Sequence, residues 1–243
     1  MRKWIIAFLL IGLLLSGVGF YLYGRSIWVP LYQAFTGKRS VGEVVSIYGR
    51  AAEKRMLPFF QAAGIAYPPA AVTMIVLKAE RRIELWAQHG GTWKFVKTYE
   101  IAGASGKPGP KLREGDRQVP EGIYRIESLN PNSSYHLSMR LNYPNAFDVE
   151  RAKLDGRSGL GGDIFINGKD DSIGCLAMGD EAIEELFVLV DRIGIRNVTV
   201  IIAPRDLRRH SAEFNSDLPS WVGGLYAILL QELLRFKLQK PDS

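Results

Sequence analysis

The chain has 243 residues, of which 47% are apolar and 23% are charged, so most of it is expected to fold rather than stay disordered. The net charge is +6, but no run of five Lys or Arg residues and no RNA-binding or helix-turn-helix signature occurs, which argues against a nucleic-acid partner. One cysteine, Cys175, excludes an internal disulfide. With three scattered histidines it offers no structural zinc site, so no metal or cofactor is expected.

The N-terminal residues predict a membrane anchor. Trp4 to Tyr23 contain no charged residue, and as a helix this run would span about 30 Å, the thickness of the hydrocarbon core of a bilayer. Aromatic residues stand at both ends, as they do at membrane interfaces. A signal peptide is the alternative, but its apolar region would be shorter and followed by a small-residue cleavage site. We therefore expect residues 1–24 to be an uncleaved single-pass anchor with its N-terminus inside.

Residues 25–69 are expected to form a helical connector. Between Ser40 and Gly64 the apolar residues recur at helical spacing, which predicts one or two helices. Pro58 marks a point where a helix would kink or end. Tyr67-Pro68-Pro69 then breaks regular structure before the next segment.

Residues 70–205 carry the strand signals of one domain. His89-Gly90-Gly91 predicts a hairpin between the second and third strands, which makes His89 a turn residue. The Gly-rich segments 103–122 and 151–162 are expected to be surface loops, the second of them mobile. Apolar and alternating runs predict strands at 72–79, 82–88, 93–101, 123–129, 135–141, 163–166 and 197–202.

Two further helices follow from the pattern. Asp180 is predicted to be the N-cap of a helix over 181–193, which carries an apolar stripe. In a C-terminal extension, 206–243, the residues 225–240 predict an amphipathic helix that packs on the domain rather than on a membrane. Together the elements predict a mainly β fold, a sandwich or barrel with peripheral helices and an N-terminal transmembrane helix.

The segment around Cys175 is the most informative one for chemistry. It reads Ser172-Ile173-Gly174-Cys175, and Gly174 lets the backbone approach a substrate carbonyl without a Cβ in the way. The amides of Gly174 and Cys175 are candidates for an oxyanion hole. Nearby positive charge favours the reactive thiolate, and Lys169 and the start of the following helix are candidate sources. Cys175 is therefore a candidate nucleophile.

This segment resembles the [Ser/Thr]-x-Gly-Cys motif of the L,D-transpeptidases, the YkuD-type domain. The resemblance is closest to the murein L,D-transpeptidase branch with a short spacing between its two motifs, and it covers roughly residues 71–205. It implies a sandwich-like β domain in which Ser172, Gly174 and Cys175 belong to the catalytic turn. Upstream elements that also resemble this branch are Gly109-Pro110-Lys111, Glu114-Gly115-Asp116, Pro120-Glu121-Gly122-Ile123-Tyr124, Tyr143-Pro144-Asn145-Ala146 and Asp148.

The resemblance implies a cysteine acyltransferase that acts on peptidoglycan peptide stems. The cysteine attacks the bond between the diamino acid at the third stem position and D-alanine, D-alanine leaves, and the acyl group passes to an amine or to water. Carbapenems acylate the active cysteines of this family. The implied location is the periplasmic, cell-wall side of the inner membrane, and the implied processes are peptidoglycan biosynthesis, cell wall biogenesis and cell shape.

One position departs from the family pattern. The family places a histidine immediately before the glycine of its first motif, where this chain has Asn167. A neutral amide cannot take the thiol proton or return it to the leaving amine. Three alternatives stay open: an impaired protein that only binds peptidoglycan, a relocated base, or a single substitution in an otherwise intact enzyme. His136 and His210 are the candidates for a relocated base, although a structural or surface role also fits each of them.

Overall fold

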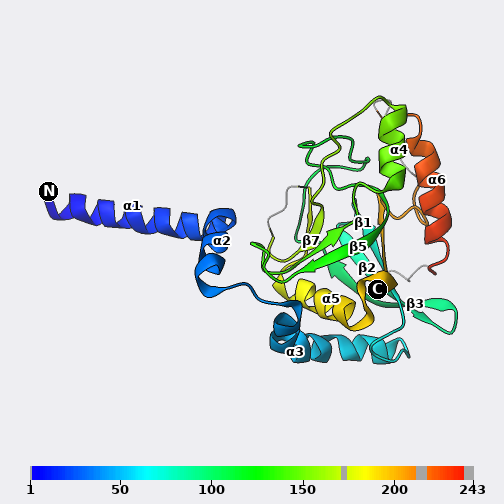
Figure 1. The fold of residues 1–243 in the computed structure, drawn as a ribbon, viewed down its shortest axis with the longest axis horizontal. Helices are drawn as coiled ribbons and strands as arrows, with labels where there is room; N and C mark the ends of the chain where they lie inside the picture. Colours follow the sequence, from blue (N-terminus) through cyan, green and yellow to red (C-terminus); the bar gives the residue numbers. More distant parts are fainter. Residues whose placement is uncertain (1, 171–173, 212–217, 238–243) are drawn as a thin grey trace.

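The computed structural model describes residues 2–170, 174–211 and 218–237. Ser172 of the cysteine motif lies outside the described residues. The chain begins with helix α1 (Arg2–Tyr23), and helix α2 (Arg25–Thr36) follows after Gly24. Figure 1 shows α1 projecting away from the rest of the molecule, with α2 at its inner end. By length and composition α1 could cross a membrane, a test that a signal sequence also passes.

Helix α3 (Val41–Ala62) begins with a capping box, in which Ser40 accepts from the Glu43 amide and the Glu43 carboxylate accepts from the Ser40 amide. The helix does not end at Pro58, which was one of the two outcomes expected there, but continues to Ala62. Met56 and Phe60, on either side of Pro58, are fully buried, so packing holds the helix together across the missing N–H. Helix α3 packs along α5 (Asp180–Ile193), and Figure 1 shows the two side by side.

The strands of the described residues form one mixed sheet in the order β3-β2-β1-β9-β5-β6-β7-β8-β4. The pairs β1–β9 and β7–β8 are parallel, and the other pairs are antiparallel. The mainly β fold class with peripheral helices and an apolar N-terminal helix is therefore confirmed. The strands are β1 (Val72–Leu77), β2 (Arg82–His89), β3 (Thr92–Glu100), β4 (Gly103–Ala104), β5 (Gly122–Asn130), β6 (Ser138–Leu141), β7 (Phe165–Asn167), β8 (Leu176–Ala177) and β9 (Val198–Ala203).

The central strands are buried on both faces, and alternate residues enter two different hydrophobic clusters. Met74 and Val76 of β1 join the cluster that contains residues of α3 and α5. Ile75 and Leu77 join the cluster under helix α6 (Val222–Leu233). The period of two in a strand thus divides the core into two layers. The C-terminal helix packs on the domain as predicted, because its apolar residues Leu225, Leu229, Leu233 and the following Phe236 are buried.

Three further local expectations were wrong. Helix α4 (Ala146–Leu154) occupies the start of the predicted loop 151–162, because Asn145 and Asp148 form a capping box that starts a helix. The N-cap of α5 is Gly179, and Asp180 is its first helical residue. Strand β6 begins only at Ser138, since His136 has a φ of 73° and takes the chain out of extended conformation.

Candidate active site

The candidate nucleophile lies just before a short strand that is next to one edge of the sheet. Cys175 immediately precedes β8, which runs parallel to β7 with Ile166 opposite Leu176 and Asn167 opposite Ala177. Because side chains alternate along a strand, Phe165 and Asn167 point to the same face of the sheet. Both of them line the pocket that Cys175 lines. The sheet register therefore brings together the two residues that the motifs singled out.

This pocket has a volume of about 530 Å³. Polar and apolar groups share its wall, which comes from β7, from the segment that joins β5 to β6 and from the end of α1. The residues that line it are Tyr23, Asn130, Asn132, Ser133, Ser134, Tyr135, Ser138, Phe165, Asn167 and Cys175. The hydroxyl and amide side chains among its lining residues suit a peptide, which offers both hydrogen-bond donors and acceptors.

The thiol of Cys175 is half-buried, and its Sγ donates a hydrogen bond to the backbone carbonyl of Asp163 at 3.7 Å. Burial raises the pKa of this thiol above its ordinary value. A backbone hydrogen bond from Phe165 and the ammonium of Lys111 oppose that rise in pKa, while the Asp163 carboxylate adds to it. The net effect favours the neutral thiol, so nucleophilic attack needs a proton acceptor.

The cation that acts on the thiol is not the one that the sequence suggested. Lys169 forms an ion pair with Asp180, and its backbone amide also donates to that carboxylate. Lys111 is the cation whose charge lowers the pKa of the thiol, by less than the Phe165 backbone does, and it lies nearly buried and pairs with Asp116 at 2.6 Å. In the sequence, the only signal for Lys111 was its place in the Gly109-Pro110-Lys111 element.

Asn167 is 3% exposed, and its side-chain Nδ2 donates to the Gly168 carbonyl at 2.6 Å. Its backbone carbonyl accepts from the Met178 amide at 2.8 Å. The next residue must be glycine, because a Cβ on Gly168 would lie 2.8 Å from both Asp180 Oδ1 and the Tyr135 carbonyl. The amide of Asn167 is thus fixed in the pocket wall, where it can hydrogen-bond to a substrate but cannot take up a proton.

The three histidines, all of which the structure describes, are not among the residues that line this pocket. The Nε2 atom of His136 lies 3.0 Å from Glu184 Oε1, and its ring meets the edge of Tyr48. His210 lines a separate pocket beside α6. His89 is exposed at the end of β2, at the predicted hairpin.

The amide of Gly174 is engaged in this structure. It donates to Ser105 Oγ at 2.6 Å, and the Ser105 hydroxyl donates to the Arg117 carbonyl at 2.7 Å. Gly174 has a φ of 81°, a conformation that favours glycine. An oxyanion would therefore have to compete with Ser105 for this amide. Ser105 is a contact that sequence reasoning missed, since it lies far away in the chain with no motif around it.

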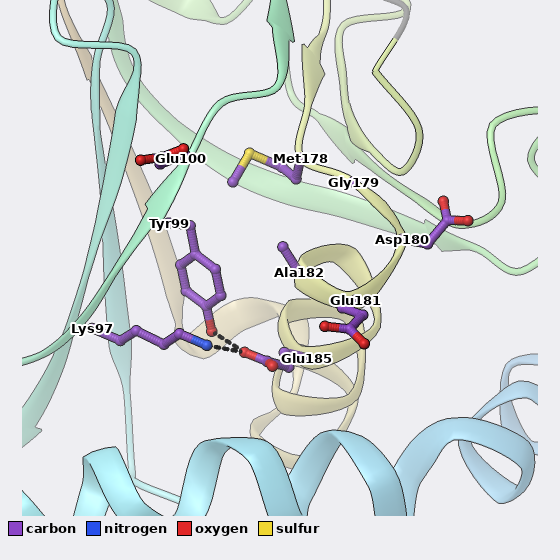
Figure 2. A pocket seen from close by; sticks show the side chains of 9 residues that line it. All are labelled: Lys97, Tyr99, Glu100, Met178, Gly179, Asp180, Glu181, Ala182 and Glu185. Carbon is purple, nitrogen blue, oxygen red and sulfur yellow. Dashed lines mark hydrogen bonds and ion pairs between the residues drawn. The ribbon is translucent and has the colours of Figure 1, made fainter.

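A second pocket, of about 420 Å³, lies at the start of α5 (Figure 2). Lys97 and Tyr99 point from β3 to the buried carboxylate of Glu185, with Lys97 Nζ at 2.7 Å and the Tyr99 hydroxyl at 2.9 Å. Arg55 of α3 reaches the other oxygen of Glu185 at 2.9 Å. The carboxylate thus has partners on both oxygens and ties α3, β3 and α5 together, which is a structural role.

The family of this chain follows from comparison of its sequence with known proteins. The model of the YkuD family, the L,D-transpeptidase catalytic domain, matches residues 71–202. Two proteins of Escherichia coli, from strains K12 and O157:H7, are named "Putative L,D-transpeptidase YafK". Each is 35% identical to this chain over 117 residues. The matched part is 47% of this chain and 45% of those relatives, so the chain spans less than half of their length.

Solved structures of this kind include the helical cell shape determining protein Pgp2 of Campylobacter jejuni. It is 21% identical, with a TM-score of 0.43, over 56% of this chain and 48% of that chain. L,D-transpeptidase 1 of Mycobacterium tuberculosis is 12% identical, with a TM-score of 0.33, over 55% of this chain and 62% of that chain. The family match covers more than half of the sequence, and the chain therefore belongs to the YkuD family of L,D-transpeptidase catalytic domains, whose activity is related to peptidoglycan.

Proposed function

We propose that this protein is a peptidoglycan L,D-transpeptidase in which Cys175 is the nucleophile. The observation that carries the proposal is the position of the sole cysteine of the chain, which lies immediately before β8 in a pocket of about 530 Å³. Family membership supports the proposed substrate class, the peptide stems of peptidoglycan. The thiolate would attack the carbonyl between the diamino acid and D-alanine and form a thioester, and D-alanine would leave with a proton on its amine.

The acyl group would then pass to the amine of a second stem, which forms a cross-link, or to water, which leaves a tripeptide. Lys111 would stabilise the thiolate by its charge, and Asn167 would hydrogen-bond to the substrate. Ser172 and Gly174 would shape the turn that presents the thiol. His136 as an alternative base would require a rearrangement, because its ring is directed at Glu184.

A second candidate function is binding of peptidoglycan stems without turnover. Two observations favour it: the residue at the position of the family base is Asn167, and burial raises the thiol pKa of Cys175 above its ordinary value. Without an acceptor for the thiol proton and a donor for the leaving amine, general acid–base help worth about 10²–10⁴ in rate would be lost.

For localisation we propose an uncleaved inner-membrane anchor at residues 1–24, with the catalytic domain 70–205 on the periplasmic side. Helix α1 supports this, because it is apolar throughout Trp4–Tyr23 and is not buried by the fold. The segment 25–69 would connect the two, and 206–243 would form the C-terminal extension. Intact-mass analysis of the membrane fraction tests the anchor, since a mature chain starting near Gly24 would show a signal peptide instead.

The enzymatic proposal is tested by intact mass spectrometry after incubation with a carbapenem, a strained β-lactam whose leaving group needs little protonation. We expect a slow single adduct on the wild type and none on Cys175→Ala, with the two proteins unfolding at the same temperature. D-alanine release from tetrapeptide stems should also be abolished in Cys175→Ala, and turnover retained there would exclude the cysteine mechanism. Stem binding with neither adduct nor D-alanine release would establish the binding function instead.

A further inference from the structure

One face of helix α2 contacts the catalytic domain. Arg25, Val29 and Gln33 follow one another at four-residue steps, so they share a face of the helix. Arg25 Nε donates to the Ser134 carbonyl at 2.8 Å, and Gln33 Nε2 donates to the Asn132 carbonyl at 3.0 Å. Val29 between them is buried.

The segment that α2 holds is part of the candidate active site. Residues 132–135 line the pocket of Cys175, and Tyr23, the last residue of α1, lines it as well. The side chain of Asn132 is further fixed by hydrogen bonds with the backbone of Arg39, just beyond α2. The N-terminal helices therefore support one wall of the pocket.

The opposite face of α2 carries large apolar side chains that the described part of the fold leaves exposed. Ile27 is 59% exposed, Leu31 59% and Phe35 91%, again at four-residue steps. Isolated exposed hydrophobic residues are ordinary, but a continuous apolar row on one helix face marks an interaction surface. Tyr32 beside this row is 60% exposed.

The position of this apolar row, directly after the apolar helix α1, indicates which surroundings would cover it. A single residue, Gly24, separates the two helices, and Figure 1 shows α2 turned aside between α1 and the domain. The turn is fixed by side chains. The Trp28 ring stacks on Tyr21 with centroids 5.3 Å apart, Trp28 Nε1 donates to the Tyr21 carbonyl, and the Arg25 guanidinium lies 5.3 Å from the Trp28 ring. Tryptophan, tyrosine and arginine are residues that favour the membrane–water interface.

We propose that α2 is an interfacial helix, which lies along the membrane surface with Ile27, Leu31 and Phe35 in the boundary between headgroups and acyl chains. A bilayer that surrounds α1 reaches this row directly, and lipid there removes its apolar surface from water. The opposite face of α2 then holds residues 132–135, so the pocket of Cys175 stands beside the bilayer surface. The inference rests on the proposed membrane anchor, but not on the catalytic activity of Cys175.

The test uses the full chain in lipid nanodiscs, in a Cys175→Ala background, with an environment-sensitive NBD fluorophore on one new cysteine at a time. The positions are Phe35→Cys on α2, Leu13→Cys on α1 as the lipid reference, and Leu154→Cys on α4 as the aqueous reference. Leu13 is 73% exposed and Leu154 is 68% exposed in the fold, so both accept a label. We expect the label at position 35 to show blue-shifted emission and strong loss of intensity with doxyl-labelled lipids, and the label at position 154 to show neither.

Each other outcome overturns the proposal in a distinguishable way. Quenching at position 13 with water-like emission at position 35 would leave the anchor in place and exclude an interfacial α2. Blue-shifted emission at position 35 without quenching by doxyl lipids would mean that protein, such as a second copy of the chain, covers the row. Absence of quenching at both positions would overturn the anchor and the interfacial helix together, while the carbapenem experiment on Cys175 would be unaffected.

Discussion

Asn167 and Cys175 face one pocket from adjacent parallel strands, since β7 ends at Asn167 and β8 begins immediately after Cys175. An amide and a thiol in this relation can hold a peptide carbonyl, but they cannot exchange a proton with each other to any useful extent. The proposed transfer reaction therefore depends on Asn167 as well as on Cys175.

The first prediction concerns Asn167→His. An imidazole at this position would accept the thiol proton and return it to the leaving amine, so the initial rate of D-alanine release should rise by at least about tenfold, the low side of the usual range for a general base. Asn167→Gln is the matched control, because it keeps an amide and should not raise the rate. Thermal unfolding must be compared, since the position is 3% exposed. Equal rates in Asn167→His and the wild type would contradict the prediction.

The second prediction separates His136 from catalysis. The Nε2 atom of His136 bonds to Glu184, and its ring packs on Tyr48. The His136→Ala variant should therefore release D-alanine at a rate within about twofold of the wild-type rate. The free energy of unfolding should fall by about 1 kcal/mol for the lost hydrogen bond and ring contact. His210→Ala is the control, with no expected change in the rate. Loss of turnover in a folded His136→Ala protein would identify a relocated base.

The third prediction concerns the pH dependence of stability. Burial raises the pKa of Asp148 from its ordinary value of 3.8 to about 6, so the folded state binds a proton more tightly than the unfolded state does. The stabilising contribution of this proton is present below pH about 4 and is lost as the pH rises through about 6. In Asp148→Asn the side-chain oxygen would still accept a hydrogen bond from the Asn145 amide. The new NH2 group would donate to the Tyr124 hydroxyl oxygen, and the Tyr124 hydroxyl would donate its proton to the Glu121 carbonyl.

Asp148→Asn should therefore match the wild type near pH 4 and be more stable at pH 7.5, by about 1–3 kcal/mol. Urea unfolding of the full chain in detergent at the two pH values measures this difference. A wild type that is less stable near pH 4 than at pH 7.5, relative to the asparagine variant, would show that the carboxylate is the stabilised form.

The fourth prediction concerns the carboxylate in Figure 2. Glu185 is 2% exposed, and its carboxylate pairs with Arg55 and Lys97 and accepts from the Tyr99 hydroxyl. Glu185→Gln would remove the negative charge that the two cations share. We expect a loss of about 1–3 kcal/mol in the free energy of unfolding, less than for a fully buried pair because the cations are partly exposed. The control is Glu181→Gln, an exposed residue one turn earlier on α5, which should change stability by less than about 0.5 kcal/mol.

The sequence by itself determined the features that a short window of residues encodes. The charge-free run from Trp4 to Tyr23 predicted α1, and alternating or β-branched runs predicted the main strands within one to three residues. The Gly-Cys motif with its upstream elements indicated the family and the candidate nucleophile. These signals are local, because helical and strand periodicity and motif spacing are properties of consecutive residues.

The tertiary structure decided which distant residues meet around the thiol. Only the packing shows that Lys111 rather than Lys169 acts on Cys175, and that Ser105 takes the Gly174 amide. It also shows that His136 turns to Glu184 and that Tyr23 lines the pocket. These contacts join residues up to about one hundred and fifty positions apart, and they depend on sheet register and helix packing, which no local pattern specifies.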